Sequence, residues 1–145
     1  MNLLIIGSGA REHTFAWKIY NSSHDVNIFV TNANPGITPF ASSVKIDITN
    51  FSSIKDCIIL HSIEIVLIGP EIPLINGLSD FINNDSDLNS VNVIGPSQKG
   101  SMLEGSKEFA KEFMIKYGIP TASFKTFDKN NYDEGVEFIN KNNSP

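Results

Sequence analysis

The sequence predicts an α/β fold, in which helices cover both faces of a doubly wound parallel sheet. Short apolar runs at residues 3–6 and 65–68 are typical of strands that are buried on both faces. Segments with apolar residues at helical spacing lie between such runs, and this alternation implies right-handed crossovers between parallel strands. The chain has 145 residues, of which 41% are hydrophobic and 19% charged, so a globular domain with a real core is expected.

The expected sheet has five parallel strands in the order 3-2-1-4-5. These strands are placed at residues 3–6, 26–30, 44–46, 64–68 and 91–94. The first helix is expected at residues 10–20, and Asn50 is in position to cap the second. A third helix is expected after Pro73, where an apolar stripe runs to Ile82, and the polar residues 83–90 are predicted to form a loop.

The pattern changes after Gly95, where the regular alternation of strands and helices ends. Ser106 is in position to cap a helix that Gly118 and Pro120 then stop. A strand at residues 122–127 and a helix at residues 132–140 are expected beyond it. This part gives no complete βαβ unit. We therefore expect a first domain at residues 1–103 and the opening of a second at residues 104–145.

Composition excludes several classes of protein. The net charge of −5 leaves no basic surplus to neutralise phosphates, so nucleic acid is not an expected partner. The single cysteine, Cys57, rules out an intrachain disulfide framework and suggests a reducing compartment. No apolar stretch approaches the length that spans a membrane, and no signal peptide is recognised. A soluble cytoplasmic protein without a membrane partner is therefore expected.

Gly7 and Gly9 follow the first apolar run and directly precede a predicted helix. Glycines let the backbone turn tightly there, and the helix directs free N–H groups and its positive dipole end at the same spot. Together these features predict an anion site, usually for phosphate; the alternative is a tight turn without a ligand. The dinucleotide fingerprint would place a third glycine at Glu12 and an acid at the end of strand two. Both are missing, which counts against NAD.

Other candidates lie beside this turn or after later strands, and each has a simpler alternative. Arg11 is suited to clamp a phosphate, or it is a solvated surface arginine. Glu71 follows strand four and suits an amine or ribose hydroxyls, or it is a first-turn acid of the next helix. The turn at residues 34–36 lines the same crevice or is an ordinary turn. His13 is interpreted as a packed histidine, and no metal site is predicted.

Four motifs occur in the order that one known family shows. They are Gly-Ser-Gly-Ala-Arg-Glu-His at 7–13, Asn-Pro-Gly at 34–36, Gly-Pro-Glu-Ile-Pro-Leu at 69–74, and Leu-Glu-Gly-Ser-Lys-Glu-Phe-Ala-Lys-Glu-Phe at 103–113, followed by Gly-Ile-Pro-Thr-Ala at 118–122. The chain thus resembles, over all 145 residues, the phosphoribosylamine–glycine ligase family of the ATP-grasp superfamily. Ala10 departs from the family, which usually has a third consecutive glycine there, and Thr14 stands where alanine is frequent.

The resemblance implies an enzyme that joins glycine to 5-phosphoribosylamine and forms glycinamide ribonucleotide, ADP and phosphate in purine biosynthesis. ATP and Mg²⁺, or Mn²⁺, serve the full-length enzyme. It also implies a substrate-presenting role for the first domain and a truncated ATP-grasp domain after it. Lys107 becomes a candidate ATP contact, although its default interpretation is a solvated lysine. The implied substrate-binding residues are Gly7, Gly9, Ala10, Arg11, Glu12, Asn34, Pro35, Gly36, Gly69, Pro70 and Glu71.

Family members are much longer than this chain. The strand with the ATP-binding lysine, the glycine-rich lid and the magnesium carboxylates would all follow Pro145. The chain is therefore interpreted as an N-terminal fragment that is inactive alone, holds no cofactor, and needs the rest of its own ATP-grasp chain as a partner. Two alternatives stay open, namely a dinucleotide-binding oxidoreductase domain and a non-catalytic α/β binding module.

Overall fold

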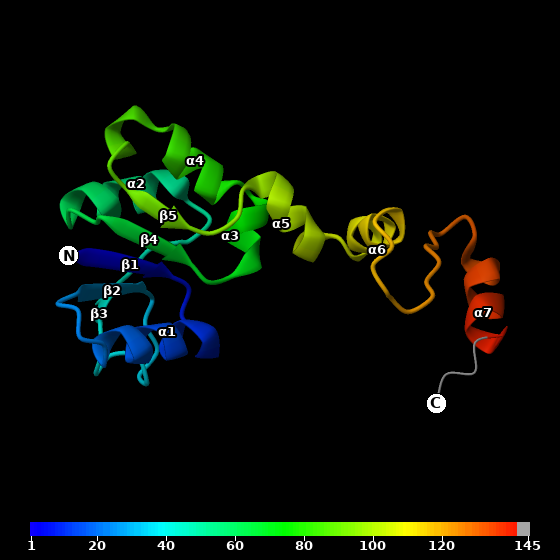
Figure 1. Cartoon of the computed structure of the whole chain (residues 1–145), viewed down its shortest axis with the longest axis horizontal. Coiled ribbons are helices and arrows are strands. Elements are labelled where there is room, and N and C mark those ends of the chain that lie inside the picture. The colour runs from blue at the N-terminus through cyan, green and yellow to red at the C-terminus, as the bar shows by residue number, and fades with distance from the viewer. Residues whose placement is uncertain (142–145) are drawn as a thin grey trace. The chain divides into compact units, whose positions relative to one another are not determined.

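A computed structural model describes residues 1–141 of the chain. Within these residues a five-stranded, all-parallel sheet has the order β3-β2-β1-β4-β5, so the predicted fold class and strand order are confirmed (Figure 1). Central β1 pairs with β2 through Leu4 and Phe29, and with β4 through Leu4 and Val66. The strands are β1 (Asn2–Ile6), β2 (Asn27–Thr31), β3 (Ser42–Val44), β4 (Ile65–Ile68) and β5 (Asn92–Ile94).

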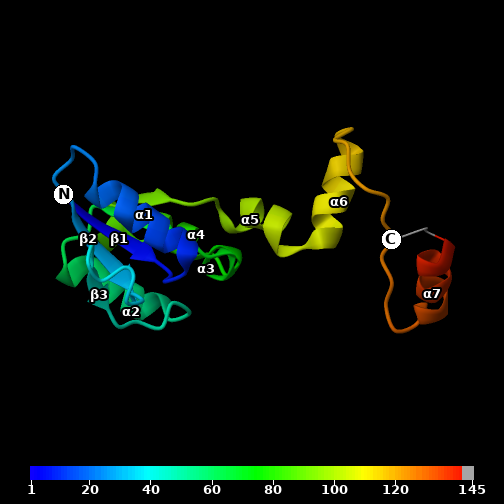
Figure 2. The same cartoon turned by 90° about the horizontal axis from the view of Figure 1, so that it is seen from below.

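Alternating side chains of β1 enter two separate cores, one on each face of the sheet. Leu3 and Ile5 pack in a cluster with Ala16 of α1 (Ala10–Tyr20). Leu4 and Ile6 pack on the other face in a cluster that includes residues of α2 (Phe51–Leu60) and α4 (Leu78–Asn84). Figure 2 shows α1 and α2 on opposite sides of the strands. This doubly wound packing explains why β1 is apolar without alternation.

The prediction of one continuous third helix is wrong. The structure has α3 (Glu71–Ile75) and α4, which are separated at Gly77. Gly77 has φ of 92°, a left-handed conformation that glycine adopts without a steric penalty and that a continuous helix cannot contain. Leu74, Leu78 and Ile82 are nevertheless all buried, so the apolar spacing continues across the break. The predicted loop 83–90 contains the end of α4 and a 3₁₀ turn, η1 (Ser86–Leu88).

Three further differences concern shorter segments. The third strand lies two residues earlier than predicted, because Ser42 to Val44 are the residues that pair with β2. Helix α5 (Gln98–Gly105) was not predicted. Residues 122–127 form no strand, so that prediction is wrong. A strand needs a neighbour for its backbone hydrogen bonds, and the rest of the described second unit is helical or irregular.

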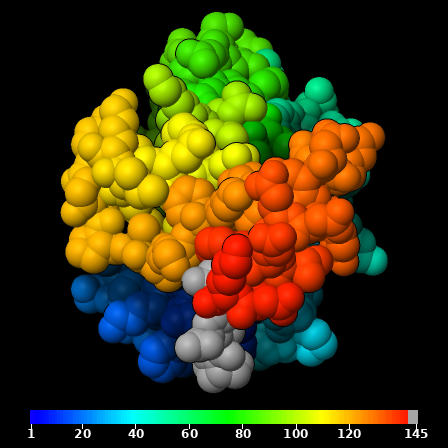
Figure 3. Space-filling model, turned by 90° about the vertical axis from the view of Figure 1, so that its right-hand side faces the viewer, coloured from blue at the N-terminus to red at the C-terminus, as the bar shows by residue number. Residues whose placement is uncertain are grey.

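The chain divides into two compact units, Met1–Gly105 and Ser106–Pro145. In the second unit, Ser106 caps α6 (Lys107–Lys116) by accepting a hydrogen bond of 3.2 Å from the Phe109 N–H. Helix α7 (Tyr132–Lys141) follows, and its atoms are coloured red in Figure 3. Among residues 106–141, Gly135 is the only buried residue. No helix in residues 1–141 is long and apolar enough to cross a membrane.

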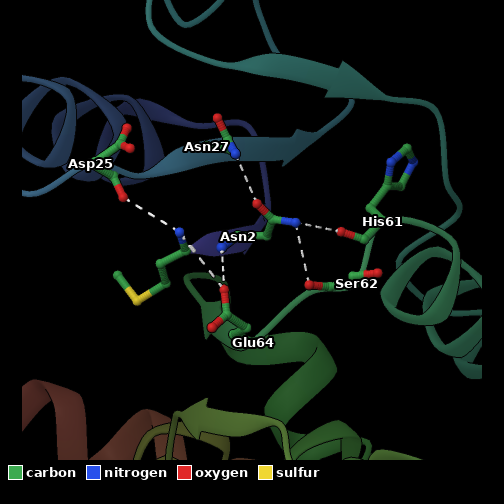
Figure 4. A network of polar contacts seen from close by, with 7 residues as sticks. Asn2, Asp25, Asn27, His61, Ser62 and Glu64 are labelled. Atoms are coloured by element: carbon green, nitrogen blue, oxygen red, sulfur yellow. Dashed lines mark hydrogen bonds and ion pairs between the residues drawn. The ribbon is translucent and has the colours of Figure 1, made fainter.

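Polar side chains join the amino ends of three neighbouring strands (Figure 4). The amide of Asn2 donates to the His61 carbonyl at 2.8 Å and accepts from Asn27 at 2.9 Å. The Asn2 backbone N–H donates to the Glu64 carboxylate at 2.8 Å. These bonds tie β1 to the starts of β2 and β4. The amino edge of the sheet is therefore occupied by internal contacts, whereas the opposite edge carries the glycine loop.

Candidate functional site

The glycine loop, residues 7–9, connects the carboxyl end of β1 to α1. Gly7 has φ of 105°, a conformation that other residues rarely adopt. Its N–H donates to the Thr31 hydroxyl, at the end of β2, over 2.7 Å. Gly9 and Ala10 are exposed and form the N-cap and first residue of α1. The loop thus presents the amino end of an eleven-residue helix at the carboxyl edge of the sheet.

Glu12 lies against this loop and is almost fully buried, with 5% of its surface exposed. Its Oε2 accepts a hydrogen bond of 2.6 Å from the Gly9 N–H. The same side chain fills the space next to Gly7 and Gly69, where neither glycine has room for a Cβ atom. The position that would hold the third glycine of a dinucleotide site is therefore occupied by a packed carboxylate.

Arg11, in the first turn of α1, and Glu71, the first residue of α3, meet at this edge. One guanidinium nitrogen of Arg11, Nη1, donates to the Gly69 carbonyl at 2.6 Å. The other, Nη2, lies 3.8 Å from Glu71 Oε2. Both side chains are about half exposed, at 55% and 45%, so the ion pair itself contributes little to stability. Their charged groups are therefore accessible to a ligand.

Asn34 connects the third predicted loop to the glycine loop. Its amide nitrogen donates to the Ser8 carbonyl at 2.6 Å, and its oxygen accepts from the Gly36 N–H at 2.8 Å. A Cβ atom on Gly36 would come within 2.9 Å of the His13 ring, so this loop lies close against α1. Pro35 completes the turn between Asn34 and Gly36. The structure thus brings the loops at 7–13, 34–36 and 69–71 together.

Pro70 and Lys107 complete the set of predicted residues. Pro70 is the N-cap of α3 and its Cδ lies against Gly7. Lys107 is the exposed first residue of α6, in the second unit. The sequence analysis does not predict the role of Thr31, because the dinucleotide fingerprint places a carboxylate, and not a hydroxyl, at the end of β2. The available signal was a hydroxyl residue at the end of the strand that neighbours the glycine loop.

A hollow of about 470 Å³ lies elsewhere in the first unit and contains none of the predicted site residues. Its two carboxylates already have partners. Asp80 accepts from the Gln98 N–H at 2.6 Å, and Asp85 accepts from Lys55 at 2.7 Å. Residues 1–141 contain no group of three or more His, Cys, Asp or Glu side chains that could hold a metal ion. The exposed charged groups at the glycine loop therefore remain the better candidate site.

Residues 1–104 match the family described as "Phosphoribosylglycinamide synthetase, N domain". The chain belongs to this family. The phosphoribosylamine–glycine ligase of Caldanaerobacter subterraneus is 37% identical over 139 residues, which make up 96% of this chain and 32% of that relative. The chain thus spans about a third of the length of this curated relative. The resemblance inferred from the four motifs is confirmed.

Solved structures of related enzymes share the fold of this chain. The phosphoribosylamine–glycine ligase of Thermotoga maritima has a TM-score of 0.65 at 26% identity, and the match covers 95% of this chain and 30% of that one. N5-carboxyaminoimidazole ribonucleotide synthetase from Thermus thermophilus has a TM-score of 0.69 at 14% identity, over 94% and 36% of the two chains. The second likeness concerns the fold alone.

Proposed function

We propose that this chain is the substrate-presenting part of a cytoplasmic phosphoribosylamine–glycine ligase. The complete enzyme would join glycine to 5-phosphoribosylamine with ATP and release glycinamide ribonucleotide, ADP and phosphate, a step of purine biosynthesis. The family match and the names of the relatives support this reaction class. The role of this chain would be to hold the phosphoribosyl substrate at the carboxyl edge of its sheet.

The main support for the proposal is that groups complementary to a phosphoribosyl substrate lie together at one cluster of loops. Free N–H groups at the start of α1 and the Arg11 guanidinium suit a phosphate. The half-exposed Glu71 carboxylate, 3.8 Å from Arg11, suits ribose hydroxyls or an amine. Gly9 and Ala10 would contact the phosphate, and residues 34–36 would form a side wall, held to the glycine loop by Asn34.

ATP would supply the energy of the reaction by phosphorylating the glycine carboxylate. Residues 1–141 contain no group of three or more His, Cys, Asp or Glu side chains that could hold a metal ion by themselves. We propose that residues 104–145 open an ATP-grasp domain whose remaining part holds ATP and the metal. Lys107 stays a candidate ATP contact within it. This chain alone is therefore expected to have no ligase activity.

The dinucleotide-binding alternative is weaker for two physical reasons. Glu12 stands at the position of the third glycine, which the dinucleotide fingerprint uses for close packing of the helix against the strand. Strand β2 ends at Thr31, whose hydroxyl already accepts from the Gly7 N–H and which offers no carboxylate for a ribose diol. A sugar phosphate needs neither feature.

An amide chemical-shift titration of this chain with ribose 5-phosphate tests the proposal. We expect shifts confined to residues 7–13, 34–36 and 69–71, and about a tenfold or greater loss of affinity in Arg11→Ala and in Glu71→Ala. Lys18→Ala is the matched control, because Lys18 is an exposed cation at the far end of the same helix. Shifts with NAD and none with the sugar phosphate would contradict the proposal. In the full-length enzyme, Glu71→Ala is expected to lose product synthesis.

A further inference from the structure

We infer that Glu12 is a positioning residue, which fixes the glycine loop and the loop at residues 69–71 in one arrangement. The expected effect of Glu12 on sugar-phosphate binding rests on the proposed function. Its effect on the arrangement of the two loops is a property of the folded chain without a ligand. Sequence reasoning placed Glu12 among the substrate contacts. Its burial and its neighbours indicate instead that it acts through the residues around it.

Three glycines of the candidate site border the same carboxyl group. A Cβ atom on Gly69 would overlap Glu12 Oε1, and one on Gly7 would lie 2.9 Å from Glu12 Cδ. A Cβ atom on Gly9 would lie 3.0 Å from Oε2. Gly7 and Gly9 come from the loop after β1, and Gly69 comes from the loop after β4. One side chain is therefore packed between the two walls of the site.

The contacts of Gly69 explain how Glu12 would influence the ligand groups. The Gly69 carbonyl accepts the 2.6 Å hydrogen bond from Arg11, while the Gly69 Cα faces Glu12. Any shift of this peptide group moves the acceptor that orients the Arg11 guanidinium. Glu12 thus positions Arg11 without touching the ligand.

The charge of Glu12 has favourable surroundings despite its burial. A buried carboxylate is strongly disfavoured unless hydrogen bonds and nearby positive charge stabilise it. Here the Gly9 N–H donates to it at 2.6 Å, and Glu12 lies in the first turn of α1, where the helix dipole favours an anion. The carboxylate therefore holds the Gly9 N–H in a fixed direction while it fills the space between the loops.

A double-mutant cycle on this chain tests the packing. The backbone of Gly69 is not in the left-handed region, and the nearest atoms to an added Cβ all belong to Glu12. We expect Gly69→Ala to lower the urea midpoint in the parent chain and to be about tenfold less damaging to the folding equilibrium constant in a Glu12→Ala background. Gly7→Ala is the control, because its φ of 105° and the nearby Pro70 keep it damaging in both backgrounds.

Additive effects of Glu12→Ala and Gly69→Ala would overturn the inference, whatever ligand the chain binds. The amide resonance of Gly9 gives a second readout, since its short bond to a carboxylate should shift it far downfield. We expect Glu12→Ala to remove this shift and Glu12→Gln to restore part of it.

Ribose 5-phosphate affinity then separates positioning from direct contact. We expect Glu12→Ala to weaken binding about tenfold and Glu12→Gln to recover most of that loss, because its amide oxygen still accepts from Gly9. Equal losses in the two variants would indicate that the charge meets the ligand, and would overturn the inference. Absence of binding in the parent chain would count against the proposed function, and the cycle would still decide the role of Glu12.

Discussion

Thr31 shows how a single buried hydroxyl holds the glycine loop in place. The residue is fully buried, and its Oγ1 accepts the Gly7 N–H at 2.7 Å. We expect Thr31→Val to lower the free energy of unfolding by about 1–3 kcal/mol, because valine keeps the shape and leaves the Gly7 N–H buried without an acceptor. Urea denaturation followed by circular dichroism measures this change.

Thr14→Val is the matched control for that measurement. Thr14 is exposed on α1 and donates to the Ala10 carbonyl, which the helix backbone already satisfies. We expect its effect to stay within about 0.5 kcal/mol, as for other surface substitutions. Equal effects of the two variants would mean that the Gly7–Thr31 bond does not stabilise the loop.

At the residue level, the sequence could predict which loops meet, but not which of their side chains are buried and which contacts they make. Glycines and charged residues at the carboxyl ends of parallel strands predict a ligand edge by topology alone. Glu12 was equally compatible with an ordinary first-turn acid. Its burial depends on Gly69, which is 57 positions away in the sequence and adjacent only after the sheet has formed.

At the scale of elements, an ion-pair cluster links α2 to the turn at η1. Lys55 Nζ lies 2.7 Å from both Asp85 and Asp87. Asp85 accepts hydrogen bonds from Lys55 and from the Asp87 N–H, and these bonds hold the pKa of Asp85 below its usual range. Hydrogen bonds to Asp85 and Asp87 raise the pKa of Lys55. The cluster therefore stabilises the fold only while Asp85 is ionised and Lys55 is protonated.

The sign of the pH dependence follows from these two directions. The contribution of Asp85 is lost as pH falls through its lowered pKa, and that of Lys55 is lost as pH rises through its raised pKa. We expect the stability difference between the parent chain and Lys55→Met to be constant between about pH 5 and pH 9 and to shrink toward acid pH. Thermal unfolding at several pH values measures it.

Lys45→Met provides the control for this pH series. Lys45 is an exposed cation just after β3, so its removal changes the net charge by the same amount. We expect its effect to be smaller and to depend less on acid pH. A difference for Lys55→Met that does not shrink below about pH 4 would show that the loss comes from side-chain packing and not from the ion pairs.

Local signals predicted the elements well where neighbouring residues determine the outcome. Asn50 accepts from the Ser53 N–H at 3.1 Å, as its capping position predicted, and α1 has the predicted bounds. The break at Gly77 was missed because Leu74, Leu78 and Ile82 keep helical spacing on both sides of it. The apolar residues at 122–127 suggested a strand, but strands depend on partners that a short segment does not reveal.

At the scale of the whole molecule, the two compact units bury their residues to very different extents. Leu4, Ile5 and Ile6 of β1 are fully buried, and β1 is paired on both sides. Within residues 106–141, large side chains such as Ile115 and Ile139 are about two-thirds exposed. Helices α6 and α7 have ten residues each, a length at which an isolated helix is marginal in water.

Native-state hydrogen exchange should therefore separate the units. We expect the amides of β1 to exchange only through global unfolding, with protection on the order of 10⁴ or more, and those of α6 and α7 to exchange through local opening with protection below about 100. Exchange measured by NMR in increasing, sub-denaturing urea checks this, because global opening accelerates steeply with urea and local opening hardly changes. Equal protection and equal urea dependence in β1 and α6 would show instead that the chain unfolds as one cooperative unit.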